Sequence, residues 1–185
     1  LKGKIMEQNF IIAGFGGQGV LFAGKVLANA FMLLGKNVTW YPCYGAEMRG
    51  GTVNCEIVIS DEEVSSVHKE NADYIIVLNQ LSFDRFLPKV KKGGLIFSNS
   101  TLVEETKTRN DIKYSSVPMT KIANESGHHK LANMVALGAL TSIVPSLTEE
   151  VLAKAIQKVL EGGKEKFYDS NLEALKLGIN SFSLV

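Results

Sequence analysis

The sequence has few residues of the kinds that build disulfide scaffolds, metal clusters or charged tails. It holds two cysteines, Cys43 and Cys55, in 185 residues. That is too few for a disulfide framework or for the four thiolates of an iron–sulfur cluster. Basic and acidic residues nearly balance, so the net charge of +1 creates no strong field for nucleic acid or an anionic membrane. Any iron–sulfur cluster that works with this chain would therefore lie on another chain.

Long hydrophobic runs are also lacking. The longest uncharged apolar run of the first expected helix, Val26 to Gly35, is too short to span a bilayer. The N-terminal residues are not followed by the long apolar core of a secretory signal. We therefore expect a cytoplasmic protein that contacts neither membrane nor nucleic acid. With 45% hydrophobic residues, the chain is long enough to bury one substantial core, which predicts a single domain over residues 8–182.

No catalytic or metal-binding constellation is evident in the sequence. There is no serine in a nucleophile elbow and no pair of carboxylates at a meaningful spacing. The adjacent His128 and His129 lack a carboxylate or a third histidine at the spacing of zinc ligands. Cys43 has no neighbouring His or Lys that would activate its thiol. We expect neither a catalytic residue nor a metal site in this chain.

What the chain does have is a glycine-rich turn between an apolar strand and an apolar helix. Phe10 to Ala13 suits a buried strand, and Val20 to Leu34 suits a helix. Between them, Gly14, Gly16 and Gly19 match the pattern Gly-x-Gly-x-x-Gly. Between a strand and a helix, this pattern is typical of dinucleotide-binding sites. In order, these glycines would allow a tight turn, the approach of a ligand and close helix packing. The helix N-terminus would offer N–H groups to an anion, although glycines also occur where a chain simply turns.

The acidic residue that a dinucleotide site requires is missing. An Asp or Glu about 20 residues after the glycine motif, at the end of the second strand, holds the ribose hydroxyls. Here the second strand is expected at Asn37–Tyr41, and it is followed by Pro42 and Cys43. The next acid is Glu47. Ordinary NAD binding is therefore disfavoured.

A second glycine-rich loop, Pro42 to Gly51, follows this strand. In a parallel sheet it would lie beside the first turn, at the carboxyl edge where open α/β sheets bind ligands. Arg49 followed by Gly50 and Gly51 would suit capture of a phosphate or carboxylate. An ion pair between Glu47 and Arg49 that only orders the loop is the alternative.

Strands and helices alternate along the rest of the chain. Strands are expected at Thr52–Ile59, Tyr74–Leu78, Leu95–Ser98 and Ile112–Val117. Helices are expected at Gln80–Phe86, Thr120–Glu125, Lys130–Val144 and Lys164–Leu177, and a further helix is expected to begin after an N-cap at Thr148. Residues 64–67 are expected to pair with the strand at residues 52–59 as a β-hairpin. Asn133 stands in an apolar helix, and we expect it to bond a buried backbone group. The pattern predicts an α/β, single-domain, three-layer Rossmann-like fold, with a mostly parallel sheet and a β-hairpin addition.

Three segments of the chain resemble the gamma subunit of 2-oxoacid:ferredoxin oxidoreductases. They are Gly14–Val20 (Gly-Phe-Gly-Gly-Gln-Gly-Val), Tyr44–Gly51 (Tyr-Gly-Ala-Glu-Met-Arg-Gly-Gly) and Asn133–Gly138 (Asn-Met-Val-Ala-Leu-Gly). The resemblance covers nearly the whole chain. The second segment is most similar to the 2-oxoglutarate branch, with the pyruvate and branched-chain branches as close alternatives and the indolepyruvate enzyme as a more distant one.

The resemblance implies a subunit rather than a complete enzyme. Complexes of this family oxidatively decarboxylate a 2-oxo acid with coenzyme A and pass electrons to ferredoxin. Thiamine diphosphate and Mg²⁺ would be held by the alpha and beta partners, and iron–sulfur clusters by beta or delta partners. The gamma chain would itself hold no such cofactor and would help to complete the coenzyme A region.

The resemblance also makes the two glycine-rich loops the candidate functional edge. Their candidate residues are Gly14, Gly16, Gly17, Gln18, Gly19, Glu47, Arg49, Gly50 and Gly51. These loops would face partner chains or contact coenzyme A phosphates, with Arg49 and the backbone amides of residues 16–19 as donors. Two alternatives stay open: a free-standing nucleotide-binding oxidoreductase and a purely structural subunit. Self-association of the isolated chain through partner surfaces is left open as well.

Overall fold

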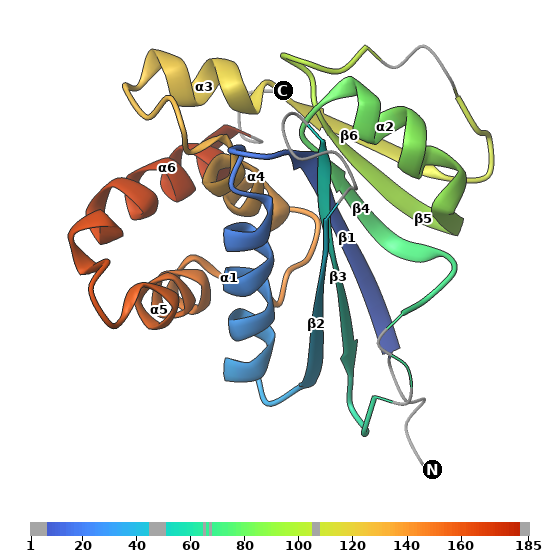
Figure 1. The fold of residues 1–185 in the computed structure, drawn as a ribbon, viewed down its shortest axis with the longest axis horizontal. Coiled ribbons are helices and arrows are strands. Elements are labelled where there is room, and N and C mark those ends of the chain that lie inside the picture. The colour runs from blue at the N-terminus through green and yellow to red at the C-terminus, as the bar shows by residue number, and fades with distance from the viewer. Residues whose placement is uncertain (1–6, 45–50, 65, 67, 105–107, 182–185) are drawn as a thin grey trace.

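A mixed sheet of six strands forms the centre of the fold (Figure 1). The structure is a computed structural model that describes residues 7–44, 51–64, 66, 68–104 and 108–181. The strands are β1 (Glu7–Phe15), β2 (Asn37–Tyr44), β3 (Thr52–Ser60), β4 (Ala72–Val77), β5 (Val90–Asn99) and β6 (Lys113–Val117), in the order β2-β3-β1-β4-β5-β6. Strands β1, β4, β5 and β6 run parallel, whereas β3 is antiparallel to both of its neighbours. The C-terminal ends of β1, β2, β4, β5 and β6 therefore share one edge, called the carboxyl edge below.

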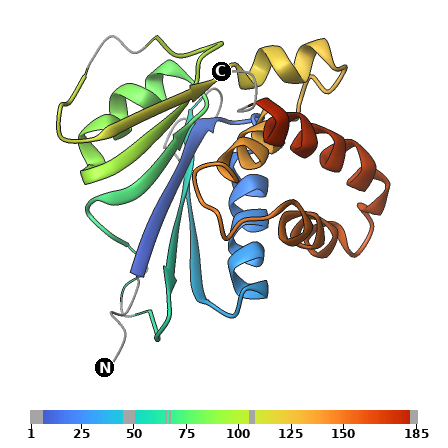
Figure 2. The same cartoon turned by 180° about the vertical axis from the view of Figure 1, so that it is seen from behind.

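Helices cover both faces of the sheet and give the predicted three layers (Figures 1 and 2). The helices are α1 (Val20–Leu33), α2 (Gln80–Phe86), α3 (Met119–Glu125), α4 (Ala132–Leu140), α5 (Glu149–Leu160) and α6 (Tyr168–Ser181), with short 3₁₀ turns at Leu87–Lys89 and Glu165–Phe167. Helices α1, α4, α5 and α6 pack on one face, and α2 packs on the other. No helix in the described part of the chain is long and apolar enough to cross a membrane.

Strand β1 is buried on both faces because successive side chains of a strand point to opposite sides. Phe10 and Ile12 join the large hydrophobic cluster under α1 and α4. Ile11 and Ala13 join the smaller cluster under α2. The continuous apolar run that predicted a buried strand at residues 10–13 is thus explained by two cores, one on each side of the sheet.

The sheet contains a β-hairpin of β2 and β3, whereas the predicted hairpin between residues 52–59 and 64–67 was wrong. Strand β3 pairs with β2, for example Ile57 with Trp40, and the two are joined through residues 45–51. The described residues of the expected return segment, Val64 and Ser66, are not in a strand. The physical reason is that β1 and β2 occupy both edges of β3, so β3 has no free backbone groups for residues 64–67.

Strand β2 continues to Tyr44, beyond the predicted end at Tyr41. Pro42 had suggested a loop, because proline cannot donate to a strand ladder. The sheet order makes β2 an edge strand, where proline is tolerated. Most other elements lie where they were predicted, including α2 at Gln80–Phe86 and the N-cap at Thr148, whose Oγ1 accepts from the Val151 amide at 3.3 Å. Helix α4 begins two residues later than predicted and ends at Leu140.

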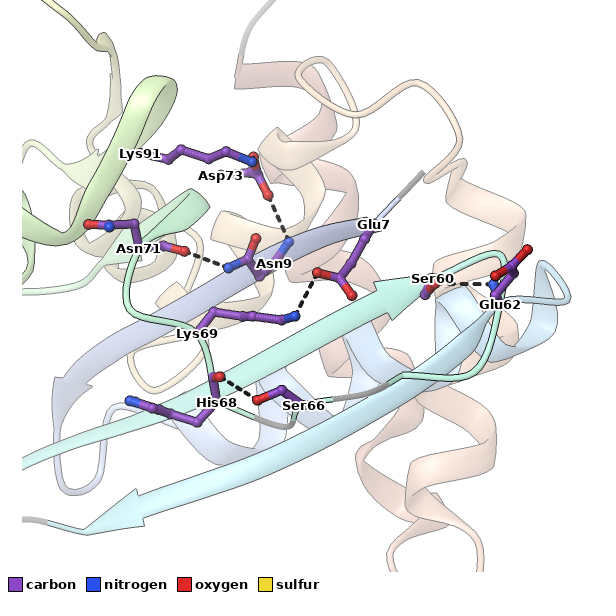
Figure 3. A network of polar contacts seen from close by, with 10 residues as sticks. All are labelled: Glu7, Asn9, Ser60, Glu62, Ser66, His68, Lys69, Asn71, Asp73 and Lys91. Carbon is purple, nitrogen blue, oxygen red and sulfur yellow. Dashed lines mark hydrogen bonds and ion pairs between the residues drawn. The ribbon is translucent and has the colours of Figure 1, made fainter. Parts of the chain in front are cut away.

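A polar network fastens the opposite edge of the sheet, where β1 begins (Figure 3). Asp73 accepts from the Asn9 amide at 3.1 Å and pairs with Lys91 at 2.8 Å. Lys69 pairs with Glu7 at 2.8 Å, and the Asn9 side chain donates to the Asn71 carbonyl at 2.6 Å. These contacts hold the connection between β3 and β4 against the start of β1.

Candidate functional site

The glycine turn connects β1 to α1 at the carboxyl edge, and its glycines are needed for different reasons. Gly17 and Gly19 have positive φ values of 93° and 73°, which other residues rarely adopt. Gly14 lies inside β1, where an added Cβ would come within 2.7 Å of Gln18 Oε1 and 2.9 Å of Val20 Cγ2. The turn therefore depends on Gly17 and Gly19, whereas Gly14 was predicted to form it and instead allows close packing.

Gly16 differs from the other glycines of the turn. It is exposed, its φ is not positive, and an added Cβ would meet no described atom within 4 Å. Neither backbone conformation nor packing within the described chain requires a glycine here. The surface at Gly16 is thus open to close approach from outside.

The Gln18 side chain faces inward and holds the turn against the sheet. Its Oε1 accepts from the Phe15 amide at 2.7 Å and from Asn79 Nδ2 at 2.9 Å. Its Nε2 donates to the Leu78 carbonyl at 3.4 Å. Gln18 was predicted as a binding residue, and both its side-chain oxygen and its backbone amide are engaged within the chain, the amide by donating to the Phe15 carbonyl at 3.1 Å.

Two asparagines that sequence analysis missed extend this network along the carboxyl edge. Asn79 caps α2, where its Oδ1 accepts from the Ser82 amide at 2.9 Å. Asn99 donates to the Leu78 carbonyl at 3.2 Å and to Thr120 Oγ1 at 2.8 Å. Each asparagine comes at the end of an apolar strand, and that position was the signal available in the sequence. Together they join the ends of β4 and β5 to the turn after β1.

The N-terminus of α1 offers hydrogen-bond donors at this edge. The first helical bond runs from the Ala23 amide to the Gly19 carbonyl at 2.9 Å, so the amides of residues 20–22 precede the helical ladder. Within the described residues, no acceptor reaches the amides of Gly16, Gly17 or Gly19. No acidic side chain lies in the first turn of α1, and its N-cap has no side-chain hydrogen bond. The dipole and the free amides therefore favour an anion or another acceptor.

The described ends of the second glycine-rich loop, Tyr44 and Gly51, lie near the glycine turn. Tyr44 pairs with Val53, and Val53 pairs on its other side with Gly14. Gly51 is buried at the start of β3. Glu47, Arg49 and Gly50 lie outside the described residues, so their predicted roles stay predictions.

Four large hydrophobic side chains are exposed along the carboxyl edge. They are Phe15, Tyr44, Leu81 and Leu102, with 36%, 72%, 53% and 44% of their surface exposed. They follow or end β1, β2, β4 and β5, and we call them the edge stripe. Phe15 directly precedes Gly16 of the glycine turn, so polar donors and exposed apolar side chains are offered at the same edge.

The two thiols are poorly suited to chemistry. Burial raises the pKa of Cys55 to about 12, and the side chain is fully buried under Gly24. The pKa of Cys43 is also raised, first by burial and then by the charge of Glu56. Both groups are protonated at neutral pH, and for Cys43 this agrees with the expectation that its thiol is not activated.

Alkylation of the folded chain with iodoacetamide at pH 8 should leave Cys55 unmodified and modify Cys43 more slowly than a free thiol. At that pH a thiol of pKa about 12 is about 10⁻⁴ thiolate, and only the thiolate reacts. Mass spectrometry of intact and digested protein would count the adducts. In denaturant both thiols should react. Rapid double modification of the folded chain would contradict the buried position of Cys55.

Comparison with known proteins identifies the family. The family model for pyruvate ferredoxin/flavodoxin oxidoreductase matches residues 9–181. The 2-oxoglutarate synthase subunit KorC of Archaeoglobus fulgidus is 38% identical over 162 residues, which cover 85% of this chain and 83% of KorC. The ketoisovalerate oxidoreductase subunit VorA of Methanothermobacter thermautotrophicus is 42% identical over 168 residues, which cover 90% of this chain and 35% of VorA. This chain thus spans about a third of the length of VorA.

The solved structures agree with these relatives. The gamma subunit of a keto/oxoacid ferredoxin oxidoreductase from Geobacter sulfurreducens is 29% identical and superposes with a TM-score of 0.79. The match covers 95% of this chain and 96% of that subunit. The chain therefore belongs to the pyruvate ferredoxin/flavodoxin oxidoreductase family, as a gamma subunit of the 2-oxoacid:ferredoxin oxidoreductase type.

Proposed function

We propose that the chain serves a complex that oxidatively decarboxylates a 2-oxo acid, 2-oxoglutarate before pyruvate or a branched 2-oxo acid, with coenzyme A and ferredoxin. Its carboxyl edge would contact the alpha and beta partner chains and complete the coenzyme A region. The observation that carries this proposal is the meeting of the glycine turn and the edge stripe at one edge. The protein would act only in the assembled complex.

The glycine turn supports a contact with an acceptor group from outside the chain. Its free amides and the N-terminus of α1 suit the phosphates of coenzyme A or backbone carbonyls of a partner. Gly16 has no described atom near its missing side chain, so an external group could approach its backbone closely. Arg49, in the adjacent loop, would add a guanidinium to the same region.

The edge stripe supports a contact with protein. Exposed apolar side chains gathered on one surface mark interaction sites more often than scattered ones do. VorA contains a unit like this chain within a longer polypeptide, whereas KorC matches over most of its length. The edge stripe would be covered when the complex assembles.

Thiamine diphosphate, Mg²⁺ and the iron–sulfur clusters are assigned to the partner chains. The sequence has two cysteines as possible ligands of an iron–sulfur cluster, Cys43 and Cys55. Cys55 is buried and protonated, so it is a poor ligand. His68, on the opposite side of β3 from α1, pairs with the buried Glu56 at 2.7 Å. Bound to the partners, these groups would supply decarboxylation and electron transfer, while this chain positions coenzyme A.

An anaerobic pull-down with the tagged chain, from cells that express all the subunits, tests the proposal. The eluate should contain partner chains and reduce viologen dye in a coenzyme A-dependent manner, fastest with 2-oxoglutarate among 2-oxoglutarate, pyruvate and a branched 2-oxo acid. If another 2-oxo acid were oxidised fastest, that acid would replace 2-oxoglutarate as the proposed substrate. A lone, inactive chain would overturn the proposal, and tight nucleotide binding by it would favour the free-standing alternative.

Arg49→Ala should raise the coenzyme A KM of the complex about tenfold, or weaken assembly by a similar factor, because one charge-assisted contact to an anion would be lost. Lys158→Ala, an exposed change on α5, is the matched control for loss of a positive charge and should change neither quantity. Unchanged assembly together with an unchanged KM in Arg49→Ala would remove Arg49 from the proposed site.

A further inference from the structure

Helix α1 begins without a cap of its own. Its N-cap residue is Gly19, which has a left-handed backbone and no side chain to bond the first turn. Helices usually begin at Ser, Thr, Asp or Asn, whose side chains fix the first amides. Gln18 holds the first part of the turn, whereas the N-cap itself is left to another part of the chain.

That part is Asn133, which lies 114 positions further along the sequence, in the first turn of α4. Its Nδ2 donates to the Gly19 carbonyl at 3.1 Å. The same carbonyl accepts from the Ala23 amide at 2.9 Å, so the first bond of α1 and the bond from α4 meet on one oxygen atom. A Cβ at Gly19 would lie 2.4 Å from Asn133 Nδ2, so the amide packs directly on the glycine backbone. The expected bond between Asn133 and a buried backbone group is thus confirmed.

The support behind Asn133 is rigid. Helix α4 packs on α6 through two glycines, where an added Cβ would lie 2.0 Å from the Leu175 carbonyl oxygen at Gly138 and 2.1 Å from the Val135 carbonyl oxygen at Gly178. The backbones of the two helices are therefore in contact, and α4 cannot shift toward α6. The contact therefore limits where the first turn of α4, and with it Asn133, can lie.

Asn133 also has a feature that packing alone does not explain. The residue is 2% exposed, and its Oδ1 has no hydrogen-bond partner among the described residues. A buried acceptor without a partner costs about 1–3 kcal/mol, which a leucine at this position would avoid. The bond from Nδ2 to the Gly19 carbonyl is thus the hydrogen bond that this buried amide makes within the described residues, and leucine would remove it.

We infer that Asn133 is a positioning residue for the glycine turn: from α4 it fixes the N-cap of α1 and so directs the turn's free amides toward an anionic ligand. This inference rests on the proposed function of the carboxyl edge. It assigns a role to the third segment of the family resemblance, which lies outside both glycine-rich loops. Asn133 acts through Gly19 and need not touch the ligand.

The test compares Asn133→Leu with Asn171→Leu in the assembled complex. Asn171, on α6, is the matched control: it is 4% exposed, its Nδ2 donates to the Phe167 carbonyl at 2.7 Å, and its Oδ1 is also unpaired. We expect Asn133→Leu to raise the coenzyme A KM about tenfold with little change in kcat. Asn171→Leu should leave KM unchanged, even where both variants shift the melting temperature.

Hydrogen exchange of the full chain gives a second readout that does not depend on activity. Without the Asn133 bond, the Ala23 amide should exchange about fivefold faster in Asn133→Leu and in the nearly isosteric Asn133→Asp, but not in Asn171→Leu. Unchanged exchange and unchanged KM in both Asn133 variants would overturn the inference. If Arg49→Ala still raised KM in that case, the proposed function would stand without it; if assembly and coenzyme A dependence failed in the unmodified complex, the proposed function would fail instead.

Discussion

Replacing Tyr44 and Leu81 together by serine is expected to abolish co-purification with the partner chains while leaving the isolated chain folded. The two side chains are 72% and 53% exposed, so little apolar burial within the chain is lost. At a partner interface, by contrast, burying them would contribute about 3 kcal/mol at roughly 25 cal/mol per Å² of apolar surface. That loss corresponds to more than a hundredfold in affinity.

A matched pair separates this effect from a general change of the surface. Met32 and Phe167 are 52% and 48% exposed, and they lie on α1 and on the 3₁₀ turn before α6, away from the carboxyl edge. Their replacement by serine should leave co-purification unchanged. Size-exclusion chromatography and circular dichroism of each isolated variant would confirm the fold. If the Tyr44 and Leu81 variant kept the partner chains and the control variant lost them, the interface would lie at Met32 and Phe167 instead.

Local patterns were sufficient to predict the elements and much of the turn. Apolar runs, glycine positions and N-cap residues depend on neighbours in the sequence, so β1, α1 and α2 could be found from them. The bond of Asn133 was also predicted in kind, because a buried amide in an apolar helix must find a partner. Its actual partner, Gly19, could not be predicted, because it lies 114 residues away and depends on how α4 packs beside α1.

The incorrect strand pairing also arose because it depends on residues that are distant in the sequence. Residues 64–67 and residues 37–44 were both suitable neighbours for β3, and only the complete strand order shows that β1 fills the other edge. The contacts of the Gln18 side chain also depend on the strand order. In the fold, β4 lies beside β1 and brings Asn79 within 2.9 Å of the Gln18 side chain. Strand order thus decides which polar residues of the edge are used internally and which are left for a partner.

Gly138→Ala is expected to destabilise the protein by about 3 kcal/mol or more, which lowers the melting temperature by roughly 6–12 °C in a chain of this size. In an ordinary helix interior this change would stabilise by up to about 1 kcal/mol, because alanine is the better helix former. Here the new Cβ would lie 2.0 Å from the Leu175 carbonyl oxygen, a backbone atom that cannot rotate away. Helices α4 and α6 would have to separate.

Gly16→Ala is the control for this prediction, because no described atom lies within 4 Å of its added Cβ and its φ is not positive. Its free energy of unfolding should stay within about 0.5 kcal/mol of the parent, as for most surface changes. Urea unfolding followed by circular dichroism measures both variants. A Gly138→Ala protein as stable as the parent would mean that α4 and α6 are further apart than the structure shows. In that case α4 would not hold Asn133 closely against the N-cap of α1.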